Sequence, residues 1–289
     1  MGLHLRRRVL EHPVASFFVL TYLLSWVTWS PLIFAEWWAT WSPLVLAEDL
    51  QTMVLIMIGG FGPLVAAALV TWAIGESVRE WAGQLLRWNV SLRYWAFALL
   101  FPAVAIIVAS LAHIVVFDGR FDPESTATLV LYPVLFVQVF LVGGGNEELG
   151  WRGFALPRLQ RSYSALVASL LIGVGWFAWH LPLFVVGGSS QAGVPVYYYG
   201  LAVVALSVVF TWLYNETGGS VLLTMVLHAS VNTGGILYLA GGGAALQTEL
   251  PNALYAVVFL VAALAAVAAY GPERLTDVEG PTRPSGSRR

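Results

Sequence analysis

Eight apolar stretches run through the chain, and each is long enough to cross the hydrocarbon core of a membrane. A helix of roughly 20 residues covers that core. In lipid every backbone N–H and C=O must be bonded within the protein, which leaves helices and closed barrels. Stretches of this length therefore predict an all-α, polytopic membrane bundle with about eight transmembrane helices. They lie at 13–34, 50–74, 94–117, 127–146, 163–187, 196–214, 219–240 and 251–270.

Composition narrows the partners of such a bundle. The 289 residues are 58% hydrophobic and 10% charged, which is more apolar material than one soluble core can bury. The net charge of -2 offers no basic stripe for phosphates, so we expect no nucleic acid partner. The absence of cysteine excludes disulfides and thiolate chemistry. The expected partner is the lipid bilayer.

Arginine placement predicts the orientation. All basic residues are arginine, and Lys and Arg enrich on the cytoplasmic side of membrane proteins. With the N-terminus inside and eight spans, every arginine except Arg120 falls on the inner side or the inner half of the membrane. The outer loops then carry acidic residues instead. We therefore expect a multi-pass protein of the cell membrane with both termini cytoplasmic.

The sequence divides into four regions. Residues 1–127 hold about three spans and an amphipathic segment near 76–93, which fits an interfacial helix on the inner surface. Residues 128–240 hold the ionisable groups described below, which make this region the expected catalytic core. Residues 241–270 hold the last span, and the polar tail at 271–289 is predicted to be disordered and cytoplasmic.

Charged side chains interrupt the fourth apolar stretch. Glu147, Glu148 and Arg152 follow three glycines there, and ionisable groups at membrane depth are costly enough to suggest function. Glu148 and Arg152 are four residues apart, so they predict an ion pair on one helix face. Glu147 is rotated about 100° away and is expected to remain available, facing two histidines.

Two later spans carry the histidines. His180 precedes Pro182, which cannot donate to the carbonyl of Ala178 and so loosens that turn. His228 and Asn232 lie one helical turn apart and are expected to point at the same space.

Depth links these groups. Counted at about 1.5 Å per residue, the histidines lie well inside the membrane, and Glu147 reaches them only if its helix continues to about Gln160. We therefore predict that the fourth span is longer than its hydropathy suggests. A bend is expected at Gly143–Gly145 or Pro157, with a cavity open to the cytoplasm.

These side chains suit hydrolysis of a peptide bond. Glu147 could take a proton from water, and His180 could hold that water or a metal that polarises it. His228 and Asn232 could donate hydrogen bonds to the oxyanion.

The ordered motifs resemble those of the CPBP family, the CAAX prenyl endopeptidases and bacteriocin-processing or immunity membrane proteins. They are Glu147-Glu148-x-x-x-Arg152, an aromatic residue four positions before His180, and His228-x-x-x-Asn232. The resemblance covers roughly residues 128–240. One departure is Trp176, because the second motif usually begins with Phe.

The resemblance implies an intramembrane endopeptidase whose partner is a membrane-embedded or lipidated peptide or protein substrate. Its catalytic residues would be Glu147, His180, His228 and Asn232, with Glu148 and Arg152 in support. In eukaryotic relatives the reaction removes the last three residues of a prenylated protein at the cytoplasmic face. The family is described both as metal-dependent and as glutamate-activated. A divalent, zinc-like ion would be held by Glu147, His180 and His228.

Two other functions stay open. Intramembrane acids and imidazoles also form proton or ion paths in transporters. Transporters with inverted repeats show matched broken helices in both halves, and here the polar groups all follow residue 140, which favours the enzyme. A non-catalytic immunity or scaffold protein that binds a peptide is the other alternative.

Overall fold

A computed structural model describes residues 9–34, 37, 48–122 and 129–278. All regular structure in these ranges is helical, and no strand occurs in them. The all-α fold predicted from the apolar stretches is confirmed for this part of the chain. The α-helices are α2 (Pro13–Ile33), α4 (Glu48–Gly60), α5 (Gly62–Ala73), α6 (Val78–Ala82), α7 (Leu92–Val116), α8 (Tyr132–Val142), α9 (Glu148–Gly150), α10 (Leu156–Leu159), α11 (Ala165–His180), α12 (Val196–Glu216), α13 (Val221–Gly234), α14 (Gly242–Ala245) and α15 (Glu249–Tyr270).

Short tighter or wider turns join several of these helices. They are the 3₁₀ turns η1 (Gly83–Leu86), η3 (Gly145–Glu147), η5 (Leu181–Val185) and η6 (Gly235–Leu237), and the π-helix η4 (Trp151–Ala155).

The described chain contains seven helical segments that are long and apolar enough to cross a membrane. The apolar stretch predicted at 219–240 forms a shorter helix, Val221–Leu237. This helix still runs from one end of the bundle to the other. Ser220 at its start donates to the carbonyl of Arg87, and Tyr238 beyond its end meets His113 at the far end of α7. Among the described residues, eight helical segments therefore traverse the bundle, and the one that carries His228 is the shortest.

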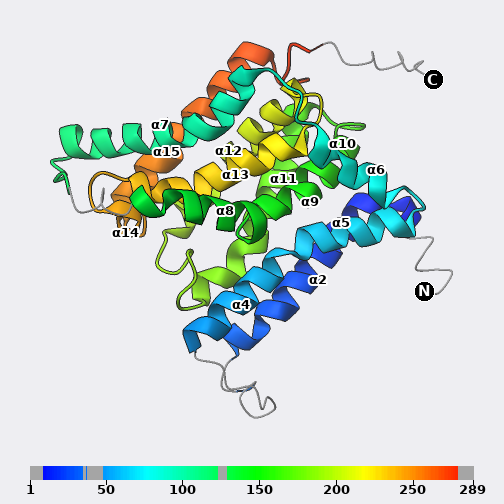
Figure 1. Ribbon diagram of the computed structural model, residues 1–289, viewed down its shortest axis with the longest axis horizontal. Helices are drawn as coiled ribbons and strands as arrows, with labels where there is room; N and C mark the ends of the chain where they lie inside the picture. The colour runs from blue at the N-terminus through cyan, green and yellow to red at the C-terminus, as the bar shows by residue number, and fades with distance from the viewer. Residues whose placement is uncertain (1–8, 35–36, 38–47, 123–128, 279–289) are drawn as a thin grey trace.

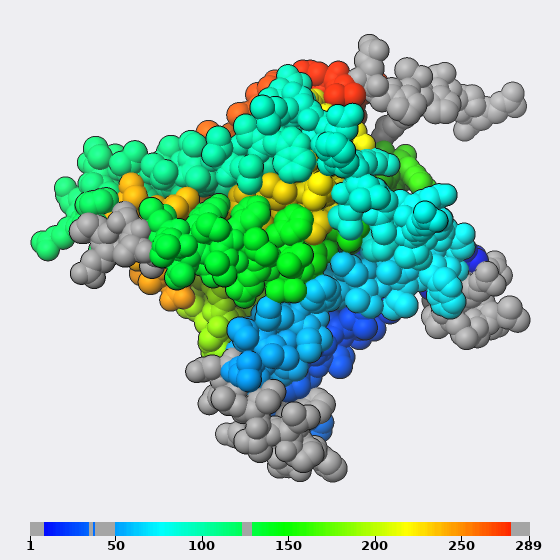
Figure 2. Space-filling model, in the orientation of Figure 1, coloured from blue at the N-terminus to red at the C-terminus, as the bar shows by residue number. Residues whose placement is uncertain are grey.

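The helices form two groups around a central core (Figure 1). The helix α2 packs on α4 and α5, and this group meets the core through α9. The core consists of α11, α12 and α13, with α7 and α15 on its other side. Figure 2 shows α13, in yellow, only in a narrow band between α7 and α8, and almost all of its residues are buried.

Glycines let the first group pack closely. A Cβ on Gly59 would lie 2.1 Å from the Trp29 indole nitrogen, and one on Gly62 would lie 2.0 Å from Ser25 Oγ. Pro63 has no N–H for the carbonyl of Gly59, and Ser25 donates to that carbonyl at 2.7 Å instead. Small residues at such contacts are typical of helix packing in membranes.

The fourth span is longer than its apolar stretch, as predicted. It extends over Leu129–Leu159. It is interrupted at Gly144, where φ is +138°, and again by the π-helix that precedes Pro157. Both predicted bend positions therefore coincide with irregular backbone.

The expected helix near 76–93 is confined to 78–86. The predicted helix does not continue beyond Leu86, because Arg87 is bonded to the turn before α13 instead. The Arg87 guanidinium donates to the carbonyl of Gly218, and Ser220 donates to the carbonyl of Arg87. These bonds replace the helical ones.

The tail is also ordered over its first part. The amides of Ala165 and Leu166, at the start of α11, donate to the carbonyls of Glu273 and Pro272. Leu275 is fully buried. The prediction of disorder is therefore wrong for 271–278. This segment supplies hydrogen-bond acceptors for the first amides of α11, which have no partners within their own helix. The rest of the predicted tail, 279–289, lies outside the described residues.

Candidate active site

The break in the fourth span places the two glutamates inside the bundle. Asn146, which is 3% exposed, donates to the carbonyl of Gly60 at 3.1 Å and accepts from the amide of Gly144 at 3.3 Å. These bonds tie the break to the junction of α4 and α5. Glu147 and Glu148 follow directly, at the start of the continuing helix.

Glu147 is held through one oxygen. Its Oε2 accepts hydrogen bonds from the indole nitrogens of Trp176 at 2.8 Å and Trp151 at 3.2 Å. No described residue donates to Oε1, and the side chain is 5% exposed. Glu147 is therefore available at one oxygen only, and the expectation of an unpaired carboxylate needs that correction.

Glu148 forms the predicted ion pair and a second contact that was not predicted. Its Oε1 accepts from Arg152 Nη1 at 3.0 Å and lies 2.8 Å from His228 Nδ1. The carboxylate in direct contact with a histidine is therefore Glu148, whereas Glu147 was expected to face the histidines. The two carboxylates diverge by the helical rotation, and α13 lies against the face that carries Glu148.

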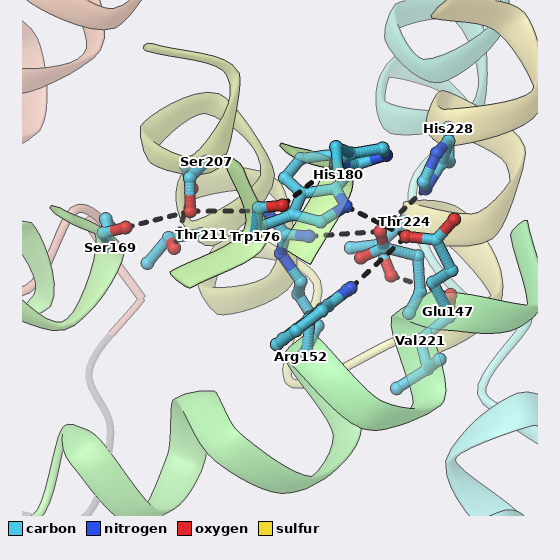
Figure 3. A network of polar contacts seen from close by, with 12 residues as sticks. Glu147, Arg152, Ser169, Trp176, His180, Ser207, Thr211, Val221, Thr224 and His228 are labelled. Atoms are coloured by element: carbon cyan, nitrogen blue, oxygen red, sulfur yellow. Dashed lines mark hydrogen bonds and ion pairs between the residues drawn. The ribbon is translucent and has the colours of Figure 1, made fainter. Parts of the chain in front are cut away.

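Arg152 is fully buried in a setting that suits a cation. Its guanidinium lies 4.7 Å from the ring centroid of Trp176 and 4.4 Å from that of Phe210. Its Nη2 donates to Ser207 Oγ at 3.3 Å. Figure 3 shows Arg152 and Trp176 between Ser207 on one side and Glu147 and His228 on the other. Cation–π contacts and the Glu148 carboxylate compensate the loss of water around this charge.

The π-helix behind the glutamates is supported from the segment before α7. Pro157 has no N–H for the carbonyl of Gly153, and Gln84 donates to that carbonyl at 3.0 Å. Trp81 donates to the carbonyl of Leu149 at 3.2 Å. Two side chains thus bond carbonyls of this irregular segment, which is a common setting for functional residues.

Hydrogen bonds define the tautomers of both histidines. His180 Nδ1 lies 2.8 Å from the carbonyl oxygen of Trp176, which can only accept. His180 therefore carries its proton on Nδ1 and presents a lone pair at Nε2 when neutral. The same reasoning applies to His228, whose Nδ1 meets the Glu148 carboxylate.

Gly144 brings the backbone against the third motif. A Cβ on Gly144 would lie 2.4 Å from His228 Nε2 and 2.8 Å from Asn232 Nδ2. Asn232 donates to the carbonyl of Gly143 at 3.1 Å. His228 and Asn232 therefore do share one space, as their spacing suggested, and the glycine turn forms its wall.

The two indoles that hold Glu147 were missed at the level of the sequence. Trp176 had been noted only as an aromatic replacement for Phe. Trp151 lies four residues after Glu147, which is the spacing of side chains on one helix face, so that signal was present. Trp176 also touches both histidines, with ring centroids 6.0 Å from His180 and 5.2 Å from His228.

The predicted metal ligands do not form a cluster in the described structure. These ligands are Glu147, His180 and His228. In the described ranges, no three His, Asp or Glu side chains gather closely enough to hold an ion. Glu147 is directed to indoles, and His228 Nδ1 is directed to Glu148. These three side chains are therefore not gathered as a ligand set in the described ranges, and the chemistry below is derived from side chains alone.

Comparison with known proteins identifies the central segment. A family profile described as "Type II CAAX prenyl endopeptidase Rce1-like" matches residues 129–234. The segment is similar to that family, and residues 129–234 are called the Rce1-like segment below. The matched residues of the Rce1-like segment include both glutamates, both histidines and Asn232. The resemblance drawn from the three motifs is thereby confirmed.

A curated relative supports the same family. "CAAX prenyl protease 2" of Methanococcus maripaludis is 33% identical over an alignment of 145 residues, and the match covers 46% of this chain and 52% of the relative. The chain thus spans about half the length of that relative. The helices α2, α4, α5 and α7 lie before the Rce1-like segment.

Proposed function

We propose that the chain is an intramembrane endopeptidase that hydrolyses a peptide bond near the C-terminus of a membrane-associated, prenylated substrate. The observation that carries the proposal is the Glu147 carboxylate. It is buried in a helical bundle, fixed at Oε2 by Trp176, whose ring also contacts both histidines, and accepts no hydrogen bond from a described residue at Oε1. A fixed carboxylate with one open oxygen is suited to general-base chemistry.

Water is the nucleophile in the proposed reaction. Glu147 Oε1 takes one proton from water as the water oxygen bonds to the peptide carbonyl carbon. His180 accepts a hydrogen bond from the remaining water hydrogen through Nε2, which orients the attack. Glu147 then delivers its proton to the leaving nitrogen as the C–N bond breaks, so the carboxylate is regenerated.

The oxyanion is stabilised from α13. Asn232 Nδ2 has a second hydrogen besides the one donated to Gly143. His228 donates from Nε2 only as an imidazolium, because its neutral form keeps a lone pair there. Glu148 then serves as the counter-charge of the imidazolium, 2.8 Å from Nδ1. We assign Glu148 and Arg152 to this supporting role.

The substrate class follows from the relative and from the position of the site. The relative is named a CAAX prenyl protease. A site enclosed by apolar helices suits a peptide whose lipid keeps it in the bilayer. We propose that the substrate enters from the end of the bundle that carries Arg87, Arg158 and Arg161, which is the predicted cytoplasmic side.

Replacement of Glu147 tests the reaction. Purified protein in lipid vesicles, with Glu147→Gln, is expected to lose cleavage of a prenylated peptide by at least about 10²-fold, the usual contribution of a general base. The matched control is Glu80→Ala, which removes an exposed carboxylate from α6. Cleavage products are quantified by mass spectrometry, and thermal unfolding reports the fold. Unchanged turnover in Glu147→Gln would refute the mechanism.

The lipid requirement is tested separately. The same peptide is compared with and without its prenyl group, at equal total concentration in vesicles. Higher kcat/KM for the prenylated form supports the proposed substrate class. Equal values of kcat/KM for the two peptides would show that the prenyl group is not recognised. The proposed substrate class would then be refuted, and only the proposed endopeptidase activity would stand.

A metal requirement stays a proposal with its own measurement. If the enzyme uses an ion held by Glu147, His180 and His228, purified protein should contain one equivalent, and His180→Ala should lose it. Metal content below one-tenth of an equivalent in fully active protein would exclude that version.

A further inference from the structure

We propose that Trp151 and Trp176, the indole pair, are positioning residues that make Oε1 the working oxygen of Glu147. The inference rests on the proposed function and adds two residues to it. Both indoles donate to the same oxygen, Oε2, at 3.2 and 2.8 Å. A carboxylate held in this way cannot rotate to exchange its oxygens without breaking both bonds.

Indoles suit this task because they only donate. The indole nitrogen has no lone pair available to accept a proton, so it cannot compete with Glu147 as a base. It also cannot accept a proton from the carboxylate. The indole pair therefore fixes Oε2 chemically as well as geometrically, and leaves proton transfer to Oε1.

Trp176 links this carboxylate to both histidines. Its carbonyl accepts from His180 Nδ1 at 2.8 Å, and its ring packs edge-to-face on His228 at 5.2 Å. The guanidinium of Arg152 lies over the same ring. One residue of α11 thus sets the orientation of groups from three segments of the chain.

Trp151 is fixed from the opposite side. It is fully buried, and its ring packs against Phe17 at 5.3 Å and Trp179 at 6.1 Å. The helix α2, which lies before the Rce1-like segment, therefore supports the donor. Rings packed on both sides have few alternative rotamers, so the two N–H groups stay aimed at Oε2.

Other buried indoles in the described residues do not donate to a carboxylate. The indole nitrogens of Trp179 and Trp212 are buried without a hydrogen-bond partner in the described residues. Two donors converge on one oxygen of Glu147 while these other donors remain unpaired. The convergence is therefore specific to the site.

Kinetics of single variants test the indole pair. Trp176→Phe and Trp151→Phe each keep an aromatic ring and remove one donor, whereas Trp212→Phe removes an unpaired indole N–H away from Glu147. We expect kcat for the prenylated peptide to fall roughly 10- to 100-fold in the first two, the usual effect of a hydrogen bond to a charged group. KM should change little, and Trp212→Phe should keep the wild-type kcat.

The contrary outcomes are distinct. A wild-type kcat in both Trp176→Phe and Trp151→Phe would overturn the inference. An equal loss in Trp212→Phe would also overturn it, because the effect would then be one of packing. If Trp176→Phe fails to fold, 3-benzothienylalanine at position 176 decides, since it has the shape of tryptophan without the N–H. It should reproduce the loss of kcat.

The test also separates this inference from the proposed function. Wild type and Glu147→Ala are compared in the same assay, and an absence of Glu147-dependent cleavage would refute the proposed function. The hydrogen bonds are then read without turnover, from the indole N–H band in ultraviolet resonance Raman spectra. Glu147→Ala should shift this band toward weaker hydrogen bonding. Identical spectra of wild type and Glu147→Ala would overturn the role proposed for the indole pair.

Discussion

Gly144 shows how closely the backbone approaches the candidate catalytic groups. Its φ of +138° is a conformation that side chains rarely adopt, and a Cβ there would meet His228 Nε2 at 2.4 Å. Gly144→Ala is expected to lower stability by about 1–3 kcal/mol through backbone strain, and to reduce turnover by displacing His228. Thermal unfolding and peptide cleavage measure the two effects.

The matched control for this substitution is Gly187→Ala, because a Cβ there would meet nothing within 4 Å. This variant should behave like wild type in both assays. Equal behaviour of the two variants would contradict the close approach described for Gly144.

Arg152 carries a second prediction at this scale. Its removal in Arg152→Ala leaves Glu148 as a buried charge without its cation, which typically costs about 3–5 kcal/mol. The midpoint of thermal unfolding should therefore drop well below that of Arg161→Ala, which removes an exposed arginine of the following turn. Similar midpoints would show that Glu148 is neutral in the folded protein or that His228 alone compensates its charge.

Spacing in the sequence predicted part of this site. The Glu148–Arg152 pair follows from four-residue spacing, and the His228–Asn232 proximity from the same rule. Spacing along one helix contains no information on which neighbouring helix faces each carboxylate. For that reason, the His228 contact of Glu148 and the Trp176 contact of Glu147 emerged only from the packed bundle.

At the scale of an element, the π-helix Trp151–Ala155 depends on a side chain 69 residues away. Gln84 donates to the Gly153 carbonyl that Pro157 leaves without a donor. Gln84→Ala should cost about 1–3 kcal/mol, since a buried carbonyl loses its partner. Pro157→Ala restores a backbone N–H near that carbonyl and should reduce the loss.

A double-mutant cycle measures this coupling. The loss of stability in Gln84→Ala is compared with and without Pro157→Ala, and a smaller loss in the second background is expected. Equal losses would show that Gln84 acts elsewhere, for example through the hydroxyl of Tyr214 that donates to it.

Elements were predicted best where hydrophobicity determines them. The extent of α2, for instance, agrees with its apolar stretch to within one residue. The helix predicted beyond Leu86 is absent, because an amphipathic pattern cannot reveal that the Arg87 guanidinium bonds to the carbonyl of Gly218. The long fourth span was predicted from chemistry, since Glu147 had to reach the histidines.

At the scale of the molecule, the segment 271–278 joins the end of the chain to the core. Its carbonyls accept from the first amides of α11, and its Thr276 and Asp277 donate to Glu216 at the end of α12. A chain shortened after Gly271 should unfold at a lower temperature than one shortened after Val278. Identical midpoints would show that these bonds add nothing to stability.

The enclosure of α13 has a consequence for how the protein is made. This helix is only 17 residues long with η6, and 12 of the 14 residues of α13 itself are buried within the protein. The surrounding helices α7, α8 and α12 therefore supply much of what retains it in the membrane. We expect α13 to settle only after these neighbours have entered the bilayer, so that a half-made chain lacks His228 at its site. Under the proposed function, hydrolysis would then begin only once α13 has taken its place in the bundle.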